Sequence, residues 1–494
     1  MPSCSLCSNR VAATFLVVAW LAGCASNPTV QMASGSGERE RQIGDEQARL
    51  IEQTIGLDRA PTIGSYVQQL GQRLAQHVSR KDIEYRFYVA DMAVPNAFAI
   101  PGGHVYVSRG LLALINSEDE LAGVIGHEIG HVEARHAVQR SRASLALAPM
   151  QIVAGLTGIA ASLISPNLGA SIVDAGHTAT KAVLAPYSRD QEREADRLGQ
   201  EIVARAGWDP RGLVNLLGTL GREERLSGAP AANGFLATHP ATPERVAATA
   251  AYADTLGHVT REPIARDRGE LLAQLDGLLL GDDPMKGMFV DNRFLLPRVG
   301  LRIAFPPGWQ VERTEGGVGA RSPDKQSVVL LQPAGIDTDP VSVVREQEKR
   351  AGVKVLDGAQ QTQINGLTAV RRDLTVAGQK GEFWLSLTWV RLGRIVWSIV
   401  AVAPSSRAQE YTPAINDSIA TFGQISDADK ALITATRLRV ARAQEAETLK
   451  LLRERTGSLW SVDQMAVANG VAADIRFAGG ELVKIPLREA FEVP

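Results

Sequence analysis

Cysteine is nearly absent from this sequence, and its few copies lie at one end. All three, Cys4, Cys7 and Cys24, fall near the start of a chain of 494 residues. The remainder therefore has no disulfide framework, no thiolate metal site and no cysteine nucleophile. Histidine is also sparse, with eight copies and none after His258, so we expect no second metal site in the C-terminal half.

The chain also lacks an excess of either charge. Its formal net charge is −2, from 52 basic and 54 acidic residues, which gives no electrostatic basis for binding nucleic acid. A hydrophobic content of 45% and a charged content of 21% are ordinary for a soluble globular protein. Because 494 residues are too many for one core, we expect two or three domains.

The first residues are typical of a bacterial lipoprotein signal. Arg10 precedes an apolar run at 11–22, which is short for a membrane span. The run leads into Leu-Ala-Gly-Cys, which resembles a lipobox, and in such signals the cysteine, here Cys24, becomes lipidated. Ser26 stands near the position of an inner-membrane retention Asp, so we expect the periplasmic face of the outer membrane. The alternatives are an incidental cysteine and a soluble periplasmic protein.

The pattern H-E-x-x-H occurs at 127–131, within a segment that predicts a helix. Four residues of helix turn through about 400°, so His127 and His131 lie on one face, one turn apart. Both imidazoles can then ligate one Zn²⁺. Glu128 could reach the water on that metal without binding the metal itself. The alternative is a helix that carries two structural histidines.

A candidate third ligand lies in a second predicted helix, 188–202. Glu192 and Asp196 are four residues apart and share a face with Ala195 and Gly199, whose small size allows close approach to the first helix. Glu192 would complete a set of two histidines and one glutamate, leaving the fourth position for water. Asp196 would orient a ligand imidazole. Glu194 points away and is interpreted as solvated, and an ordinary surface charge is the alternative for Glu192.

Four motifs in order resemble the HtpX and CAAX-prenyl-protease family of gluzincin zinc peptidases, nearest to its BepA-like periplasmic branch. They are N-A-F-A-I-P-G-G at 96–103, H-E-x-x-H, E-x-E-A-D at 192–196, and T-H-P at 238–240. The resemblance covers roughly half of the chain and implies one zinc ion and action on misfolded envelope proteins. In that family a His-Pro loop lies over the zinc cleft. His239 is therefore expected to contact the metal or stabilise an oxyanion.

Two further residues are candidates for contacts with substrate. Asn96 opens a predicted strand beside the zinc helix, where a peptide could add as an extra strand, and a turn-forming role is its alternative. Arg245 follows the His-Pro loop and is expected to contact substrate or to support the cleft. Together these residues predict a zinc metalloendopeptidase in which Glu128 moves the proton. The alternative is a chaperone-like or scaffolding lipoprotein with a latent site.

The apolar stretch 145–164 has no charge and is long enough to span a membrane. A single crossing there would put Glu192 on the other side of the bilayer from His127 and His131. We therefore predict a packed helical hairpin, with shallow membrane contact as the alternative.

The second half of the chain predicts an α+β region and a small tail. Strands at 299–305, 327–331, 368–376, 382–391 and 394–402 and helices at 341–351 and 408–422, with F-P-P-G-W at 305–309, resemble the sandwich of PsbP and Mog1 domains. The tail has the order β-α-α-β and resembles a LysM module, which binds N-acetylglucosamine polymers. Peptidoglycan is thus a candidate partner, and a docking module is the alternative. Outer-membrane assembly proteins are a further candidate, which the resemblance to the BepA-like branch implies.

The predicted fold class is α+β: a mainly helical metallopeptidase domain with a small edge sheet, then the sandwich, then the LysM-like tail. The predicted boundaries are a signal peptide at 1–23, a tether at 24–38, the metallopeptidase domain at 39–258, a linker at 259–285, the sandwich at 286–424 and the tail module at 425–494.

Overall fold

The computed structural model describes residues 37–58, 60–139, 186–228, 234–257, 262–314, 316–351, 356–378 and 381–493. The predictions for the signal peptide, for Cys24, for nearly all of the tether and for the stretch 145–164 lie outside these residues. Among the helices of the described ranges, none combines the length and the apolar character needed to cross a membrane.

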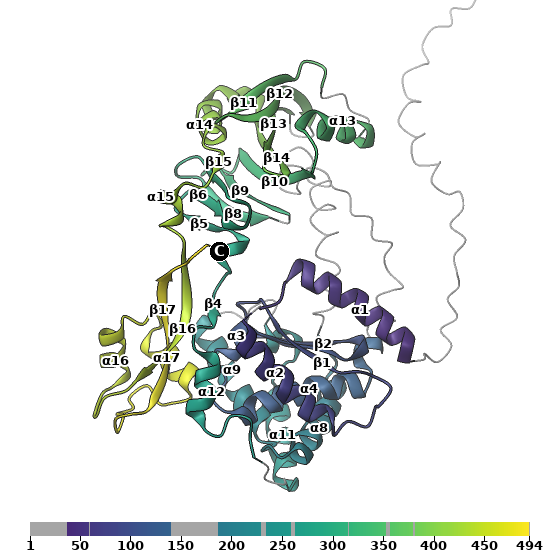
Figure 1. Ribbon diagram of the computed structural model, residues 1–494, viewed down its shortest axis with the longest axis vertical. Coiled ribbons are helices and arrows are strands. Elements are labelled where there is room, and N and C mark those ends of the chain that lie inside the picture. Colours follow the sequence, from purple (N-terminus) through teal and green to yellow (C-terminus); the bar gives the residue numbers. More distant parts are fainter. Residues whose placement is uncertain are drawn as a thin grey trace, which may run out of the picture.

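The N-terminal region is mainly helical, with a three-stranded sheet at one side (Figure 1). Its helices are α1 (Gly37–Thr54), α2 (Pro61–Ala75), α3 (Arg109–Leu112), α4 (Glu118–Glu133), α8 (Arg189–Ala206), α9 (Gly212–Ser227), α10 (Phe235–Thr238) and α11 (Pro243–Thr255). The sheet has the order β1-β3-β2, formed by β1 (Arg86–Ala90), β3 (His104–Ser108) and β2 (Ala97–Ile100). β1 runs parallel to β3, and β2 runs antiparallel to it.

Glycines let α4 and α8 approach closely enough to share a site. A Cβ atom at Gly130 would lie 2.5 Å from the carbonyl oxygen of Ala195, and one at Gly199 would lie 2.7 Å from backbone atoms of Gly126. Real Cβ atoms do not come so close to backbone, so any larger residue would push the helices apart. The small residues that the sequence places on α8 therefore set the distance between the two helices.

Glu118 anchors the first turn of α4 to three other parts of the region. Its buried carboxylate accepts hydrogen bonds from Tyr66 Oη at 2.8 Å, from Trp208 Nε1 at 2.7 Å and from the backbone nitrogen of Ile264 at 2.8 Å. Hydrogen bonds to a charged group are among the stronger ones in proteins. The start of the helix that carries the H-E-x-x-H pattern is thereby held in a defined position.

The segment 259–285, predicted as a linker, contributes to the core of the N-terminal region. Helix α12 (Arg268–Leu275) buries Leu271, Leu272 and Leu275 in that core. After α12 the chain turns at Gly277, which has a φ of 86°, and continues as the short strand β4 (Leu279–Leu280). The left-handed backbone at a glycine is a common end to a helix. That end lets β4 pair with the tail.

The second region is built on a seven-stranded sheet of order β11-β12-β13-β14-β10-β9-β8. Its strands are β8 (Gln310–Thr314), β9 (Gly317–Arg321), β10 (Val328–Ile336), β11 (Gln360–Ile364), β12 (Leu367–Gly378), β13 (Gly381–Leu392) and β14 (Ile395–Pro404). A four-stranded sheet contains β5 (Met288–Val290), β6 (Arg293–Leu296), β7 (Leu301–Ala304) and β15 (Gly423–Gln424).

Residues alternate between the two faces of the larger sheet, as strand geometry requires. On β10, Val328 and Leu330 join one core with α13 (Pro340–Ala351), while Val329 and Leu331 join the other. That second core also contains residues of α14 (Ala408–Ala420) and of the four-stranded sheet. The region is therefore α+β, as predicted, although β5, β6, β8, β9, β11 and β15 were not expected.

The tail has the predicted β-α-α-β order. It consists of β16 (Thr434–Arg442), α16 (Leu449–Thr456), α17 (Val462–Asn469) and β17 (Leu482–Ala490), preceded by α15 (Asp427–Lys430). Helix α15 ends at Lys430, and β16 begins four residues later at Thr434. β16 pairs with β17 on one side and with β4 on the other. The resemblance to a LysM module stays a prediction.

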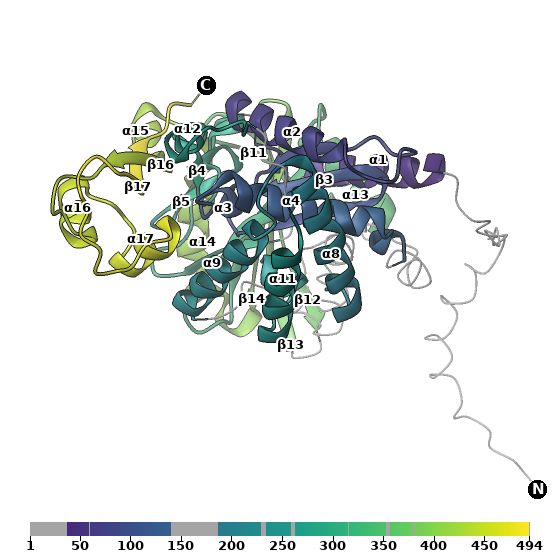
Figure 2. The same cartoon turned by 90° about the horizontal axis from the view of Figure 1, so that it is seen from below.

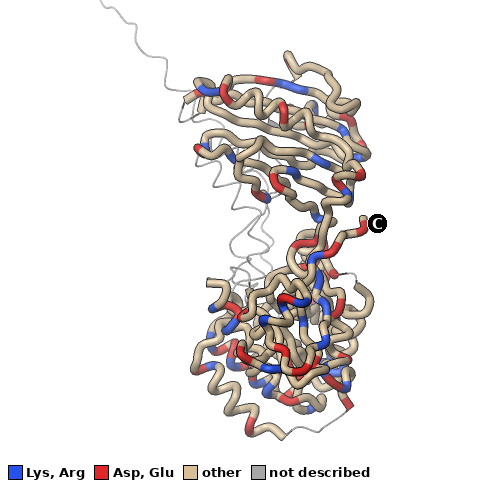
Figure 3. The backbone as a smooth tube through the Cα atoms, turned by 90° about the vertical axis from the view of Figure 1, so that its left-hand side faces the viewer, with Lys and Arg blue, Asp and Glu red and all other residues tan. Residues whose placement is uncertain are grey.

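The tail is packed against the N-terminal region rather than hanging from it (Figures 1 and 2). Lys484 of β17 is fully buried, and its Nζ donates hydrogen bonds to the carbonyl oxygens of Ala113 at 2.9 Å and Ile115 at 2.6 Å, just before α4. Burial lowers the pKa of this amine well below its usual value. Leu438 and Ala468 of the tail belong to the same core as α4. Figure 3 shows the strand-rich second region above the N-terminal region and the tail. Basic and acidic residues are interspersed on both parts.

Candidate metal centre

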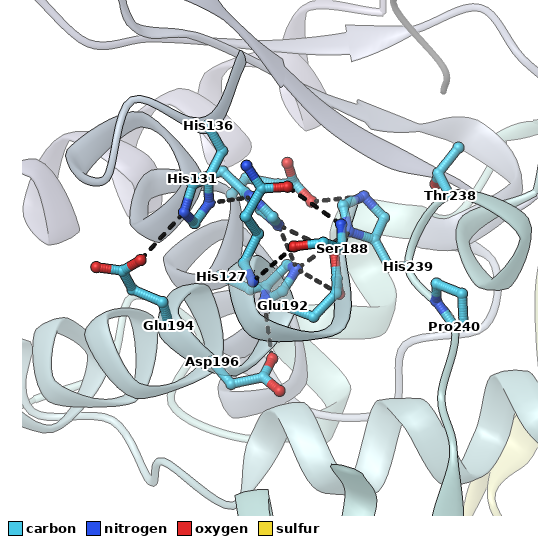
Figure 4. A network of polar contacts seen from close by, with 12 residues as sticks. His127, His131, His136, Ser188, Glu192, Glu194, Asp196, Thr238, His239 and Pro240 are labelled. Atoms are coloured by element: carbon cyan, nitrogen blue, oxygen red, sulfur yellow. Dashed lines mark hydrogen bonds and ion pairs between the residues drawn. The ribbon is translucent and has the colours of Figure 1, made fainter. Parts of the chain in front are cut away.

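Four buried side chains from three segments converge at one point. They are His127 and His131 of α4, Glu192 of α8, and His239, which follows α10 (Figure 4). One nitrogen or oxygen atom from each lies within 4.8 Å of the others, and none of the four side chains is more than 2% exposed. The described residues contain one such group of potential metal ligands.

The distances between these atoms lie within about 0.4 Å of those around a single tetrahedral ion. Four ligands bound at about 2.0–2.2 Å to one tetrahedral ion lie roughly 3.3–3.6 Å from one another. Here Nε2 of His127 is 3.1 Å from Nε2 of His131 and 3.2 Å from Nδ1 of His239. The oxygens of Glu192 lie 2.9 Å from His239, 3.4 Å from His131 and 3.7 Å from His127. Three imidazoles and a carboxylate, without sulfur, suit Zn²⁺.

Asp196 supports the first of these histidines from behind. Its Oδ1 lies 2.9 Å from Nδ1 of His127, so the other ring nitrogen, Nε2, faces the cluster. Arg245 donates two hydrogen bonds to the same carboxylate, at 2.8 and 2.7 Å, and Thr249 donates a third at 3.1 Å. Burial opposes ionisation of Asp196, but Arg245 and His127 hold the pKa of its carboxyl well below the usual range.

Arg245, a candidate for contact with substrate, is engaged by the protein in this structure. Besides Asp196, its guanidinium contacts Glu192 and donates to the carbonyl oxygen of Pro240 at 3.2 Å. Arg245 thus connects α11 to Glu192 and Asp196 of α8, and its roles in supporting a cleft or contacting substrate stay predictions. Burial also opposes ionisation of Glu192, yet the adjacent histidines keep the pKa of that carboxyl far below normal.

His239 reaches the cluster because its loop is tied down at both sides. The backbone nitrogen of Phe235 donates to the carbonyl oxygen of Pro95 at 2.9 Å, and that of Tyr187 donates to Thr238 at 3.3 Å. The ring of Phe235 also stacks on His239, with centroids 4.5 Å apart. Through these contacts His239 takes the fourth position around the point that His127, His131 and Glu192 face.

Glu128 and Asn96 lie in the same buried zone. Glu128 has no exposed surface, and its Oε1 is 3.5 Å from Nε2 of His239. Asn96 is fully buried beside Pro95, and its backbone nitrogen donates to Ser108 Oγ at 2.8 Å. The structure thus brings together the residues that the sequence suggested around 127–131, 192–196, 239 and 245, and their roles in catalysis or binding stay predictions.

Two residues at the centre were not expected from the sequence. Tyr187 stacks on His131, with ring centroids 3.9 Å apart and an interplanar angle of 22°. His136 is buried, and its Nδ1 lies 2.9 Å from Nδ1 of His131. Glu194, interpreted as solvated, is half exposed but lies 3.3 Å from Nε2 of His136. A third histidine shortly after H-E-x-x-H was the available signal for His136.

Comparisons with known proteins agree with this geometry. Residues 63–253 match the model of Peptidase family M48, so the match includes all four potential ligands. The beta-barrel assembly-enhancing protease of Escherichia coli (strain K12) is 30% identical over 209 residues, which make up 42% of this chain and 42% of that protein. The metalloprotease YcaL of the same bacterium is 29% identical over 242 residues, covering 46% of this chain and 90% of YcaL.

The matched part is less than half of the beta-barrel assembly-enhancing protease. Among solved structures, the solution structure of cyanobacterial PsbP from Synechocystis sp. PCC 6803 overlaps 28% of this chain and 95% of that chain. The TM-score of this overlap is 0.23, at 9% sequence identity. The PsbP-like sandwich stays a prediction.

Proposed function

We propose that this chain, whose residues 63–253 belong to Peptidase family M48, is a zinc-dependent metalloendopeptidase. The observation that carries the proposal is the buried convergence of His127, His131 and Glu192, which α4 and α8 hold at distances suited to one ion. When bound there, Zn²⁺ supplies a Lewis acid for the scissile carbonyl and lowers the pKa of water.

The proton work falls to Glu128. This residue is next to a proposed ligand in the sequence, and its carboxylate is fully buried, so bulk water is kept away from it. In the proposed reaction Glu128 accepts a proton from the attacking water. It then gives that proton to the amine nitrogen as the peptide C–N bond breaks.

Strand β2 supports binding of an extended peptide. It lies at one end of the sheet, paired with β3, and it packs against α4. A peptide that adds along such a strand is held by backbone hydrogen bonds, which do not depend on its side chains. Because unfolded proteins offer extended segments, misfolded envelope proteins are the proposed substrates. The name of the beta-barrel assembly-enhancing protease likewise refers to the assembly of β-barrel proteins.

Metal analysis tests the proposal directly. We expect about one zinc per chain in the purified protein, together with cleavage of casein, which is largely unfolded. His131→Ala should lose both the zinc and the cleavage, whereas His77→Ala, outside the cluster, should keep both. Removal of the metal with a chelator should abolish cleavage, and added Zn²⁺ should restore it. Cleavage that persists in a pure His131→Ala sample would overturn the proposal.

Location rests on Cys24 and its lipobox. We infer that the mature chain is attached to the outer membrane through a lipid on Cys24, facing the periplasm. In fractionated cells the wild type should sediment with membranes and Cys24→Ala should become soluble. If Cys24→Ala is not released, the anchor is refuted.

The two proposals for the tail are separated by mixing the soluble Cys24→Ala variant with peptidoglycan. If the protein sediments with peptidoglycan, the tail binds glycan. If the protein stays in solution, the tail is a docking module only.

A second function is favoured by the fourth protein group at the cluster. With His239 beside Glu192 and His127, the closed arrangement offers four ligands from the chain, as in structural zinc sites. A protein that stayed in this state would bind unfolded chains without cutting them. The chaperone-like alternative therefore depends on whether His239 leaves the cluster.

A further inference from the structure

The two histidines of the H-E-x-x-H pattern have different partners behind them. His127 has a carboxylate, because Nδ1 lies 2.9 Å from Asp196 Oδ1. At His131 the partner is a second imidazole, since Nδ1 lies 2.9 Å from Nδ1 of His136. The His136 ring in turn contacts a carboxylate, because its Nε2 is 3.3 Å from Oε2 of Glu194 (Figure 4).

A break in the helix creates this contact. His136 is five residues after His131, so a continuous helix would turn it about 140° away. Instead α4 ends at Glu133, and the chain turns through Arg135, whose φ of 59° is in the left-handed region. Such a conformation costs about 1–2 kcal/mol for a residue other than glycine. Ion pairs of Arg135 with Glu40 and Asp82 help to hold the turn.

The chemistry of imidazole determines which ring donates the hydrogen bond between His131 and His136. Nε2 of His131 faces the cluster and must be bare of hydrogen to bind a metal, so the proton of the neutral ring is on Nδ1. That N–H needs an acceptor, and the nitrogen 2.9 Å away is Nδ1 of His136. A neutral His136 that accepts at Nδ1 carries its own hydrogen on Nε2. That nitrogen donates to Glu194.

We propose that His136, backed by Glu194, is a positioning residue that holds the ring orientation and tautomer of His131. The inference rests on the proposed function in one respect, which is that His131 binds the metal. The half-exposed Glu194 ends the chain of hydrogen bonds at the surface, whereas His136 and His131 are buried. Tyr187 covers a face of the His131 ring, so the two nitrogens at the ring edge stay directed at His136 and at the ligand cluster.

Zinc affinity tests the proposal, measured on the full chain by competition with a chromogenic chelator. Loss of a partner behind a metal ligand typically lowers affinity about 10–100-fold, so His136→Phe, which keeps a ring but no acceptor, should weaken zinc binding by that factor. His136→Gln supplies an amide oxygen and should recover most of the loss. Glu194→Gln should have a smaller effect, since water can replace a half-exposed partner.

A matched control lies on the same helix. Asp190 of α8 is 93% exposed and outside the chain of contacts, so Asp190→Asn should leave zinc affinity unchanged. The absorption spectrum of the Co²⁺-substituted protein should shift in His136→Phe and return towards wild type in His136→Gln. If His136→Phe fails to fold, Glu194→Gln is compared with Asp190→Asn. Weaker zinc binding by Glu194→Gln would support the proposal, and equal binding by the two variants would overturn it.

The outcomes separate this proposal from the proposed function. Zinc binding by folded His136→Phe within twofold of wild type would overturn the role of His136 and leave the peptidase assignment intact. An equal loss in the Phe and Gln variants would overturn the hydrogen-bond argument. A wild type that binds zinc but never cleaves would overturn the proposed activity, while the affinities of the variants would still test His136.

Discussion

Replacing Glu128 by Gln is expected to abolish peptide cleavage while leaving about one zinc per chain. Gln has nearly the shape of Glu but cannot accept the proton of the attacking water, and a positioned general base contributes about 10²–10⁴-fold to a rate. The three proposed ligands, His127, His131 and Glu192, are unchanged in this variant. The measurement is the cleavage rate of casein together with zinc analysis of the same sample.

Glu192→Gln is the control that separates catalysis from metal binding. Glu192 lies on the other helix, with its oxygens 3.4 and 3.7 Å from the two histidines, and it is a proposed ligand rather than a base. Its replacement should lose zinc and cleavage together, whereas Glu128→Gln should lose cleavage alone. Undiminished cleavage by pure Glu128→Gln would refute the role of Glu128, and loss of zinc from that variant would show that Glu128 holds the site together.

The part of the site within two helices could be predicted from the sequence because helical periodicity relates residues four apart. His127 with His131, and Glu192 with Asp196, each share a face for this reason. The close approach of the two helices could also be predicted, from the small side chains of Ala195 and Gly199. His239 is on a loop that no periodicity describes, and it was expected through resemblance to a family.

His136 and Tyr187 were missed for physical reasons. The contact of His136 with His131 depends on the left-handed backbone of Arg135, and arginine rarely adopts this conformation, so the sequence does not indicate it. Tyr187 precedes the N-cap of α8, and its stacking on His131 depends on how two segments far apart in the chain meet. Loop and turn geometry of this kind is decided by tertiary packing.

The same limit applies to the fold. Long apolar strands such as β13 and β14 were predicted, because a strand that is buried on both faces has a near-continuous apolar run. β8 and β11 contain mostly polar residues and lie at the two edges of the sheet, so they lack that pattern. The buried Lys484 is a further case, since a charged residue type gave no sign that it would reach the carbonyl oxygens before α4.

Replacing His239 by Ala is expected to raise the rate of casein cleavage about tenfold and to weaken zinc binding. In this structure His239 takes the fourth position that the attacking water needs, so cleavage requires the loop at 234–240 to move. The two backbone hydrogen bonds that tie this loop down contribute about 1–3 kcal/mol together. If the closed state is favoured by that amount, only a minor fraction of the wild type has the fourth position open. In His239→Ala that position is open without movement of the loop.

The opposite result would give His239 a different role. If its imidazole stabilises the developing oxyanion, His239→Ala should slow cleavage by about 10²–10³-fold, as removal of one such group does in other hydrolases. The double variant with Glu128→Gln must be inactive if the gained cleavage uses the same site. If neither wild type nor His239→Ala cuts any unfolded protein although both bind zinc, then binding without cleavage is the function. A faster His239→Ala therefore indicates a gate, a slower one indicates a group that stabilises the oxyanion, and no cleavage by either protein indicates a chaperone-like function.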